Sequence, residues 1–421
     1  MNLTQRDKKH IWHPLKQHQT HPESLGIVKA KGCILTDEQG NEYIDAISSW
    51  YTCMFGHCND YIINKVHQQM QQLDQVMFSD FTHPPAVELS EKLIAILPEN
   101  QAKIYFNDNG STSVEAAIKM ALQYYFNKED KRTTFIAFEN GFHGDTFGAM
   151  ATSGLSVYNG PFEDFLMDVK RIPTPNGENH AEILVQLQDI VNNESVAGFV
   201  YEPLVQGAAG MKVHNADGLN EILKFCKEHH ILTIADEVMT GFGKTGSYFA
   251  SDYVTTKPDI VCMSKALTGG LVPMGITSCT QEIYDAFLSN EIGKGFFHCH
   301  TYSANPIACA SAIASIDLLT SEEIQTKIKE IIAAHQAFNQ KVKKHPKVKS
   351  TRQQGVIFAL DLDTNMERYG ALRDLLLKSF MQEGVFLRPL GSTIYIQVPY
   401  VITKLQLTKV YDTIIKVLDA I

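Results

Sequence analysis

The sequence predicts an α/β protein with a large central domain, built around a mostly parallel sheet, and a smaller α+β domain. Two patterns predict this fold class. From about Pro85 onward, apolar runs of strand length alternate with amphipathic helical stretches, as in βαβ units. The last hundred residues instead mix helices with short strands. At 421 residues, the chain is long enough for two or three domain-sized units with a substantial core.

The central domain is expected to contain six strands, because six short apolar runs lie between the helical stretches. These runs are Lys103–Phe106, Thr134–Phe138, Val196–Tyr201, Ile231–Ala235, Asp259–Met263 and Met274–Ser278. The clearest helix is Thr112–Asn127. Its apolar residues recur at the spacing of one helix face. They are Val114, Ala117, Ile118, Ala121, Leu122 and Tyr125.

The flanks of this domain have a different character. Residues 1–55 hold short strand-like pieces separated by Gly26, Gly32 and Gly40. Residues 322–421 read as helix, strand, helix, two short strands and helix. We therefore expect three parts: an N-terminal segment (1–55) that joins the small domain, a large domain (56–321) and a C-terminal small domain (322–421).

Charge and composition exclude several classes of partner. The chain has 37 Lys and Arg against 47 Asp and Glu, a net charge of −10, which argues against nucleic acid or an anionic membrane. It has no apolar stretch long enough to span a bilayer, and its polar start does not resemble a secretory signal. The eight cysteines are too scattered for a disulfide framework. A cytoplasmic location is expected.

Two apparent motifs are rejected. The run from Gly241 to Gly246 has the spacing G-x-G-x-x-G, but it neither follows its strand directly nor opens a helical pattern, as a dinucleotide site requires. His298-Cys299-His300 and the group Cys53, His57 and Cys58 lack the paired spacing of a structural zinc site. No metal is expected.

Two charged residues each follow an apolar run at its carboxyl end. Asp236 follows Ile231–Ala235, and Lys265 follows Asp259–Met263. Open α/β sheets bind their ligands at this edge. We therefore expect Asp236 and Lys265 to face a common site.

Further polar and aromatic residues follow two other expected strands. Gly110 and Ser111 open a helix, where free backbone N–H groups and a hydroxyl suit a phosphate. Phe142 and His143 stand between two glycines, which let a flat ring approach the backbone closely. The pattern predicts a phosphate seat beside a stacking aromatic.

Together these groups match the needs of pyridoxal 5′-phosphate (PLP). PLP binds a lysine amine covalently and needs an anion beside its pyridine nitrogen. A carboxylate about 4 Å from that nitrogen stabilises the protonated ring by about 4 kcal/mol at an effective dielectric near 20. This raises the pKa of the ring nitrogen by about 3 units. We expect PLP as the cofactor, Lys265 as the catalytic residue and Asp236 as the anion.

In this order the motifs resemble those of the class III aminotransferases. The motifs that carry the resemblance are Gly110-Ser111, Phe142-His143-Gly, Glu202-Pro-Leu-Val-Gln206-Gly, Asp236-Glu-Val238, Lys265-Ala-Leu-Thr-Gly-Gly and His300-Thr301. The resemblance implies the PLP-dependent transferase fold of type I, with Glu202 and Val238 in the cofactor site. It also implies a homodimer with shared active sites, in which Thr301 reaches the neighbour's cofactor phosphate.

Other motifs resemble the branch of this class that acts in biotin synthesis. They include Trp12-His13-Pro14, Ser48-Ser49-Trp50, His143-Gly-Asp145 and Arg388-Pro-Leu-Gly with Ile394-Tyr395. The resemblance implies transamination of 7-keto-8-aminopelargonate to 7,8-diaminopelargonate, with Trp50, Asp145, Arg388 and Tyr395 in the substrate pocket. The physical chemistry agrees, since the guanidinium fork of Arg388 suits a carboxylate and an indole suits an aliphatic chain.

Departures from that branch leave the amino donor open. Members that use S-adenosylmethionine carry Tyr, Trp, Tyr and Arg where this chain has Leu15, Tyr51, Phe142 and Lys244. The donor is therefore S-adenosylmethionine or lysine. Two alternative functions also remain: an ornithine- or 4-aminobutyrate-type ω-amino acid aminotransferase, and a non-catalytic binding protein on the same fold. The Ser-Ser-Trp50 motif argues against the first and Lys265 against the second.

Overall fold

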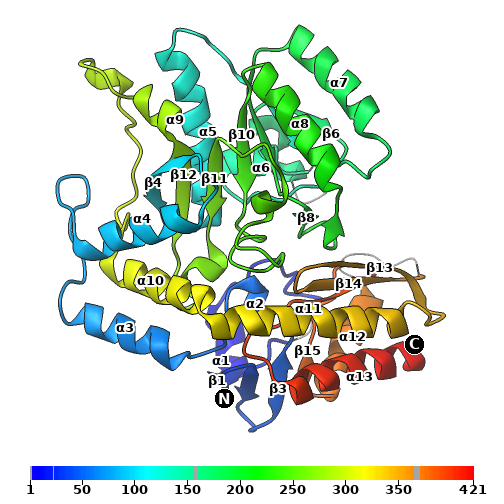
Figure 1. Ribbon diagram of the computed structural model, residues 1–421. Helices are drawn as coiled ribbons and strands as arrows, with labels where there is room; N and C mark the ends of the chain where they lie inside the picture. Colours follow the sequence, from blue (N-terminus) through cyan, green and yellow to red (C-terminus); the bar gives the residue numbers. More distant parts are fainter. Residues whose placement is uncertain (1, 22, 155–158, 365–369) are drawn as a thin grey trace.

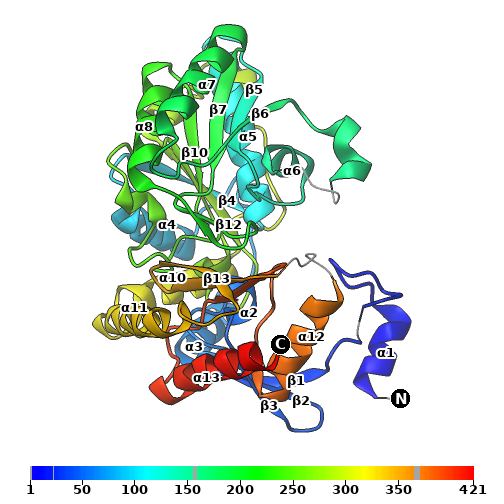
Figure 2. The same ribbon diagram turned by 90° about the vertical axis from the view of Figure 1, so that its right-hand side faces the viewer.

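The computed structural model describes residues 2–21, 23–154, 159–364 and 370–421. Figure 1 shows the large domain above and the small domain below, with α10 and α11 running along the boundary between them. Both chain ends lie in the small domain, and α1 stands at its outer side (Figure 2).

A seven-stranded sheet forms the centre of the large domain within the described residues. Its order is β4-β12-β11-β10-β7-β5-β6. The bounds are β4 (Gln101–Asn107), β5 (Thr134–Phe138), β6 (Val169–Ile172), β7 (Val196–Tyr201), β10 (Leu232–Asp236), β11 (Ile260–Met263) and β12 (Gly275–Thr280). Only β12 runs antiparallel to its neighbours, so the prediction of a mostly parallel sheet is confirmed.

Six of these strands are the predicted ones, with ends that differ by up to two residues. The seventh, β6, was not predicted. Lys170 and Arg171 interrupt its apolar pattern, and an edge strand tolerates such residues because one side of it faces no other strand.

Helices cover both faces of the sheet. In β5, Phe135 and Ala137 point into one apolar cluster with α5 (Gly110–Asn127), whereas Ile136 and Phe138 point into another with α7 (His180–Asn193) and α8 (Ala216–Glu228). Successive side chains of a strand face opposite ways, so a strand buried on both faces reads as a continuous apolar run. This explains why these strands were visible in the sequence.

The small domain combines the two ends of the chain. One sheet has the order β1-β2-β3-β15, in which β3 (Glu42–Asp45) pairs in parallel with β15 (Val385–Phe386). A second sheet has the order β13-β14-β16. The N-terminal segment thus shares a sheet with the C-terminal residues. The predicted boundaries at 55/56 and 321/322 stay predictions.

The remaining elements complete the two domains. Those before the central sheet or in the small domain are α1 (Leu3–His10), β1 (Ile27–Lys31), β2 (Ile34–Asp37), α2 (Ser48–Tyr51), α3 (Asp60–Met70), α4 (Pro84–Ile96), α11 (Glu322–Val342), β13 (Val348–Gln354), β14 (Ile357–Leu362), α12 (Ala371–Gln382), β16 (Thr393–Ile396) and α13 (Lys404–Ala420). Those within the large domain are α6 (Phe147–Thr152), η1 (Gly160–Phe165), β8 (Val205–Gln206), β9 (Lys212–Val213), η2 (Ala250–Tyr253), η3 (Lys265–Thr268), α9 (Gln281–Asp285), η4 (Ile292–Lys294) and α10 (Pro306–Thr320).

Two features are absent from the described residues. In that part of the chain, no helix combines the length and apolar character needed to cross a membrane. Nor does it hold a group of three or more His, Cys, Asp or Glu side chains placed to bind a metal ion.

Candidate active site

The site lies where the carboxyl ends of β10 and β11 meet the loop after β5 and the start of α5. Asp236 is the last residue of β10, and Lys265 begins η3, separated from β11 only by Ser264. The two strands are parallel neighbours, so their carboxyl ends share one edge of the sheet. The structure therefore brings together the two residues whose positions in the sequence predicted a common site.

Asp236 is oriented by two hydrogen bonds. Its Oδ2 lies 2.8 Å from Nδ1 of His143, and its Oδ1 accepts a hydrogen bond of 3.0 Å from the backbone N–H of Val238. His143 is itself fixed, because its backbone N–H donates to Oγ of Ser153 at 2.9 Å. The other ring nitrogen of His143, Nε2, is buried and has no partner within the described chain.

The start of α5 forms an anion seat. Asn109 caps the helix by accepting from the backbone N–H of Thr112 at 3.0 Å, and the first N–H groups of a helix are not used by the helix itself. The loop after β5 packs closely here. An added Cβ on Gly144 would lie 2.3 Å from Oγ of Ser111, and the N–H of Asp145 donates to that same oxygen at 3.2 Å.

The other side of the seat is closed by Val238. A Cβ built on Gly110 would lie 2.8 Å from Cγ1 of Val238. The absence of a side chain at Gly110 therefore lets the strand end after β10 approach the helix start. The predicted set Gly110, Ser111 and Val238 comes together.

A buried carboxylate supports the loop that carries Phe142. Glu202 accepts hydrogen bonds from the backbone N–H groups of Phe142 (3.0 Å) and Gly207 (2.9 Å). Burial raises the pKa of Glu202 to about 7, and the charge of Asp236 adds to this rise. The Phe142 side chain is 45% exposed, so it retains surface that a flat ligand can contact.

Lys265 lies in a setting that favours the free amine. Burial lowers the pKa of Lys265, while the charges of Asp236 and Glu202 oppose this shift. Its Nζ lies 5.2 Å from the centre of the Tyr51 ring. Tyr51 was noted in the sequence only as a departure from related enzymes, so its contact with the lysine was missed.

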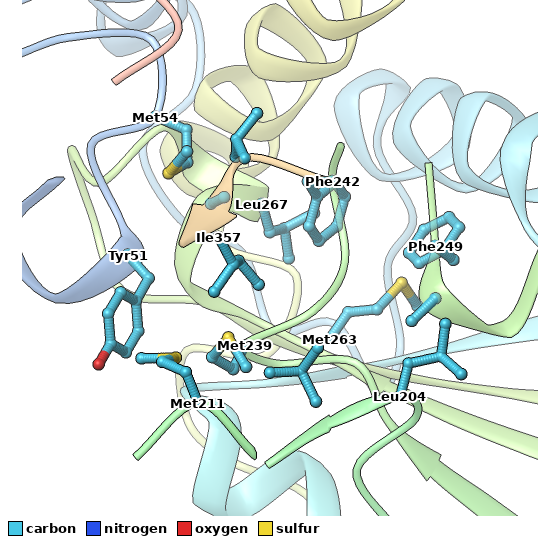
Figure 3. Close-up of a cluster of buried hydrophobic side chains, with 14 of the residues drawn as sticks. Tyr51, Met54, Leu204, Met211, Met239, Phe242, Phe249, Met263, Leu267 and Ile357 are labelled. Carbon is cyan, nitrogen blue, oxygen red and sulfur yellow. The ribbon is translucent and has the colours of Figure 1, made fainter. Parts of the chain in front are cut away.

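Three of the four predicted substrate residues, Trp50, Arg388 and Tyr395, lie near Tyr51. The Cζ of Arg388 lies 4.8 Å from the centre of the Trp50 ring, in reach of a cation–π interaction. The rings of Tyr51 and Tyr395 lie 5.8 Å apart at 60°. The Oη of Tyr395 is buried with no partner in the described residues. Figure 3 shows the Tyr51 ring at the edge of a cluster of buried side chains that includes Met211 and Met239.

Two predicted residues stand apart from these contacts. Asp145 is exposed, and only its backbone is joined to Ser111. Thr301 is also exposed, in a loop whose backbone accepts a hydrogen bond from Nε2 of Gln75 at 2.9 Å. The structure gives Thr301 no contact with Lys265, and its role stays a prediction.

The Gly241–Gly246 loop opens no helix, which agrees with the rejection of a dinucleotide motif. It holds Lys244, a lysine with no exposed surface whose Nζ donates to the carbonyl of Gly241 at 2.8 Å. Burial lowers the pKa of Lys244 well below its usual value, and the nearby charge of Lys265 lowers it further. Sequence reasoning identified Lys244 as a departure without locating it.

The family model for class-III aminotransferases matches residues 15–418, nearly the whole chain. The chain belongs to the class-III aminotransferases. The predicted family is confirmed, and with it the prediction of an enzyme.

Individual class-III aminotransferases are similar over the full length. The chain is 40% identical to the adenosylmethionine-8-amino-7-oxononanoate aminotransferase of Synechococcus elongatus, over 98% of this chain and 99% of the relative. The crystal structure of the enzyme of that name from Methanocaldococcus jannaschii matches with a TM-score of 0.93 at 31% identity, covering 99% and 98%. An amine transaminase from an uncultivated Pseudomonas species, solved in its PLP-bound form, matches with a TM-score of 0.89 at 28% identity, covering 96% and 97%. The predicted type I transferase fold is confirmed.

Proposed function

We propose that this aminotransferase transfers an amino group to 8-amino-7-oxononanoate (7-keto-8-aminopelargonate) and forms 7,8-diaminopelargonate for biotin synthesis. The observation that carries the proposal is the cluster of Trp50, Tyr51, Arg388 and Tyr395 next to Lys265. It offers a cation for a carboxylate, apolar rings for an alkyl chain and a reactive amine. The name shared by the full-length relatives supports the same substrate.

PLP is the proposed cofactor, and the residues present fit it. The anion seat at Gly110 and Ser111 suits its phosphate, and Nε2 of His143 is a buried polar atom without a partner in the described chain. The PLP-bound form of the similar amine transaminase also supports PLP. Lys265 would bind it covalently and Asp236 would face its ring nitrogen.

Further residues would complete the cofactor site. Phe142 and Val238 would contact the two faces of the ring, and Glu202 would hold the Phe142 loop through the backbone bond described above. When bound, PLP supplies an electron sink that stabilises negative charge at the amino-bearing carbon.

Four residues of the chain would have separate roles in the reaction. Lys265, released as a free amine, would take a proton from the amino-bearing carbon and return it on the cofactor side. Its lowered pKa favours this because a protonated lysine cannot act as a base. Arg388 would bind the carboxylate of the keto acid through two of its N–H donors. Trp50 would cover the alkyl chain and exclude water, and Asp145 would receive an ammonium group.

The amino donor is left as a choice between S-adenosylmethionine and lysine. The four departures at Leu15, Tyr51, Phe142 and Lys244 bear on it. Lys244 is buried and donates to the carbonyl of Gly241, and Leu15, which is 52% exposed, has no polar side-chain atom to offer a donor. Both donors enter the test below.

We also infer a homodimer. An apolar patch made of Met77, Phe81, Phe297 and Tyr302 exposes between 60% and 74% of each side chain. The hydrogen bond between Gln75 and Thr301 joins its two segments. Such a patch is typical of an interaction surface. In the proposed homodimer, Thr301 would reach the neighbour's phosphate seat, as the resemblance to the family implies.

The homodimer is tested by sedimentation of Phe297→Asp in the PLP-loaded protein. A charge within the patch is expected to give monomers without transaminase activity. A Phe297→Asp protein that remains dimeric would contradict this interface. The cytoplasmic location stays a prediction, consistent with eight cysteines that are all free.

The reaction is tested with the PLP-loaded protein and a panel of acceptors. The panel contains 8-amino-7-oxononanoate and the carbonyl partners of ornithine and 4-aminobutyrate, each offered with S-adenosylmethionine or lysine as donor. The proposal expects 7,8-diaminopelargonate with at least one of the two donors. Turnover of only the ω-amino acid partners would overturn it.

A further inference from the structure

The segment that carries Trp50 and Tyr51 has an unusual backbone. Ser48, Ser49, Trp50 and Tyr51 all have positive φ, at 49°, 46°, 68° and 70°. This left-handed region is unfavourable for any residue with a Cβ. A run of four such residues persists only where surrounding bonds over-determine it.

Asp45, at the end of β3, supplies those bonds. It is wholly buried. Its Oδ1 accepts from the backbone N–H of Ile47 at 3.1 Å, and its Oδ2 accepts from the backbone N–H and the Oγ of Ser49 at 2.7 and 3.0 Å. The same Oδ2 lies 2.8 Å from Nε2 of His57. A single carboxylate thus joins the left-handed segment to His57, which lies six residues beyond the end of that segment.

His57 is the charged partner of this carboxylate. Burial lowers the pKa of His57, but hydrogen bonds with Asp45 and Cys53 raise it more strongly, to about 10. At neutral pH the ring is therefore protonated. A buried carboxylate without such a partner is unfavourable, so removal of His57 would disturb every bond that Asp45 makes.

The segment places two side chains of the pocket. The Trp50 ring lies 4.8 Å from Cζ of Arg388, and the Tyr51 ring lies 5.2 Å from Nζ of Lys265. We propose that the Asp45–His57 ion pair is a positioning device that holds the left-handed segment and so aims Trp50 at Arg388 and Tyr51 at Lys265. This positioning role does not depend on which substrate the enzyme uses, whereas the expected change in KM for the keto acid rests on the proposed function.

Trp50 is a direct reporter of this role, because the chain has only two tryptophans, Trp12 and Trp50. In a Trp12→Phe background, acrylamide quenching measures how well Trp50 is covered, with no substrate present. His57→Ala is expected to raise the quenching constant of Trp50 at least twofold. His57→Gln, which can still donate to Asp45, is expected to keep it near the parent value.

A matched control is His67→Ala, which removes an exposed histidine of α3 and should leave Trp50 quenching unchanged. Circular dichroism identifies variants that fail to fold. If His57→Ala does not fold, Trp50 quenching is measured instead in Asp45→Asn, which keeps the shape of the side chain and removes its charge. Quenching equal to that of the parent in the folded variant would overturn the proposal.

Kinetics separate positioning from a general structural defect. With 8-amino-7-oxononanoate, His57→Ala is expected to raise KM about tenfold and to lower kcat less than threefold, and His57→Gln should restore KM. A fall in kcat alone would contradict the proposal. If the keto acid is not a substrate at all, the proposed function fails while the fluorescence result still decides the role of the ion pair.

Discussion

Gly144→Ala tests the anion seat through one methyl group. Gly144 has φ of +132°, a conformation that residues with a Cβ rarely adopt. Its added Cβ would lie 2.3 Å from Oγ, 2.6 Å from Cβ and 2.8 Å from Cα of Ser111. Two of these atoms cannot rotate away, so the clash cannot be relieved by a side-chain rotation.

The size of the effect follows from these distances. Ordinary contact begins at 3.4 Å, and the nearest atom that cannot rotate away is Cβ of Ser111 at 2.6 Å, so Ser111 and the loop must separate by 3.4 − 2.6 = 0.8 Å. Such a displacement would break a charged hydrogen bond to the phosphate, which contributes about 1.5–3 kcal/mol, the equivalent of roughly 10- to 100-fold in Kd. The backbone conformation adds roughly 1–3 kcal/mol of strain. We expect the Kd for PLP to rise about 100-fold and the melting temperature to fall.

The assay is equilibrium titration of the PLP-free protein with PLP, followed by absorbance. Gly293→Ala is the matched control, because no heavy atom lies within 4 Å of its added Cβ, and it should bind PLP like the parent. A Kd for Gly144→Ala within about threefold of the parent would refute the placement of the phosphate between Ser111 and the Gly144 loop.

Three further predictions follow from the site. Lys265→Ala should fold and bind PLP but lose both the absorbance of the lysine-bound cofactor and all transamination; retained turnover would contradict its role. Arg388→Lys should raise KM for the keto acid roughly 10- to 100-fold, the equivalent of about 1.5–3 kcal/mol for a charged hydrogen bond, because lysine lacks the fork; an unchanged KM would place the carboxylate elsewhere. Glu202 has a folded pKa of about 7 against 4.5 unfolded, so its ionisation destabilises the fold increasingly as pH rises from about 4.5 to 7, by up to about 3 kcal/mol at 1.36 kcal/mol per unit. The melting temperature of Glu202→Gln minus that of the parent should therefore increase from pH 5 to pH 8. If this temperature difference does not change with pH, the prediction is wrong.

The fold was largely predictable because its signals are local. The helix α5 shows its apolar face as a regular spacing, and the buried strands β5 and β10 read as apolar runs. Asp236 and Lys265 were predictable as site residues because both follow such strands. The edge strand β6 was not predictable, since Lys170 and Arg171 give it no apolar pattern.

The substrate side of the site depends on contacts between distant parts of the chain. Trp50 meets Arg388 because β3 pairs with β15. A short strand was predicted at Val385–Arg388, but the residues of a strand do not reveal which distant strand it pairs with. The left-handed run at Ser48–Tyr51 is invisible in the sequence because no glycine marks it. Its conformation is fixed by Asp45 and His57, whose pairing is a property of the folded chain.

The most direct test of the account is a single turnover on 8-amino-7-oxononanoate. The protein is loaded with pyridoxamine phosphate, mixed with the keto acid in the absence of any donor, and followed by absorbance and by mass spectrometry of the product. The account predicts one 7,8-diaminopelargonate per active site, with return of the absorbance of lysine-bound PLP in the parent. Absence of the diamine, with turnover of the carbonyl partner of 4-aminobutyrate under the same conditions, would contradict it.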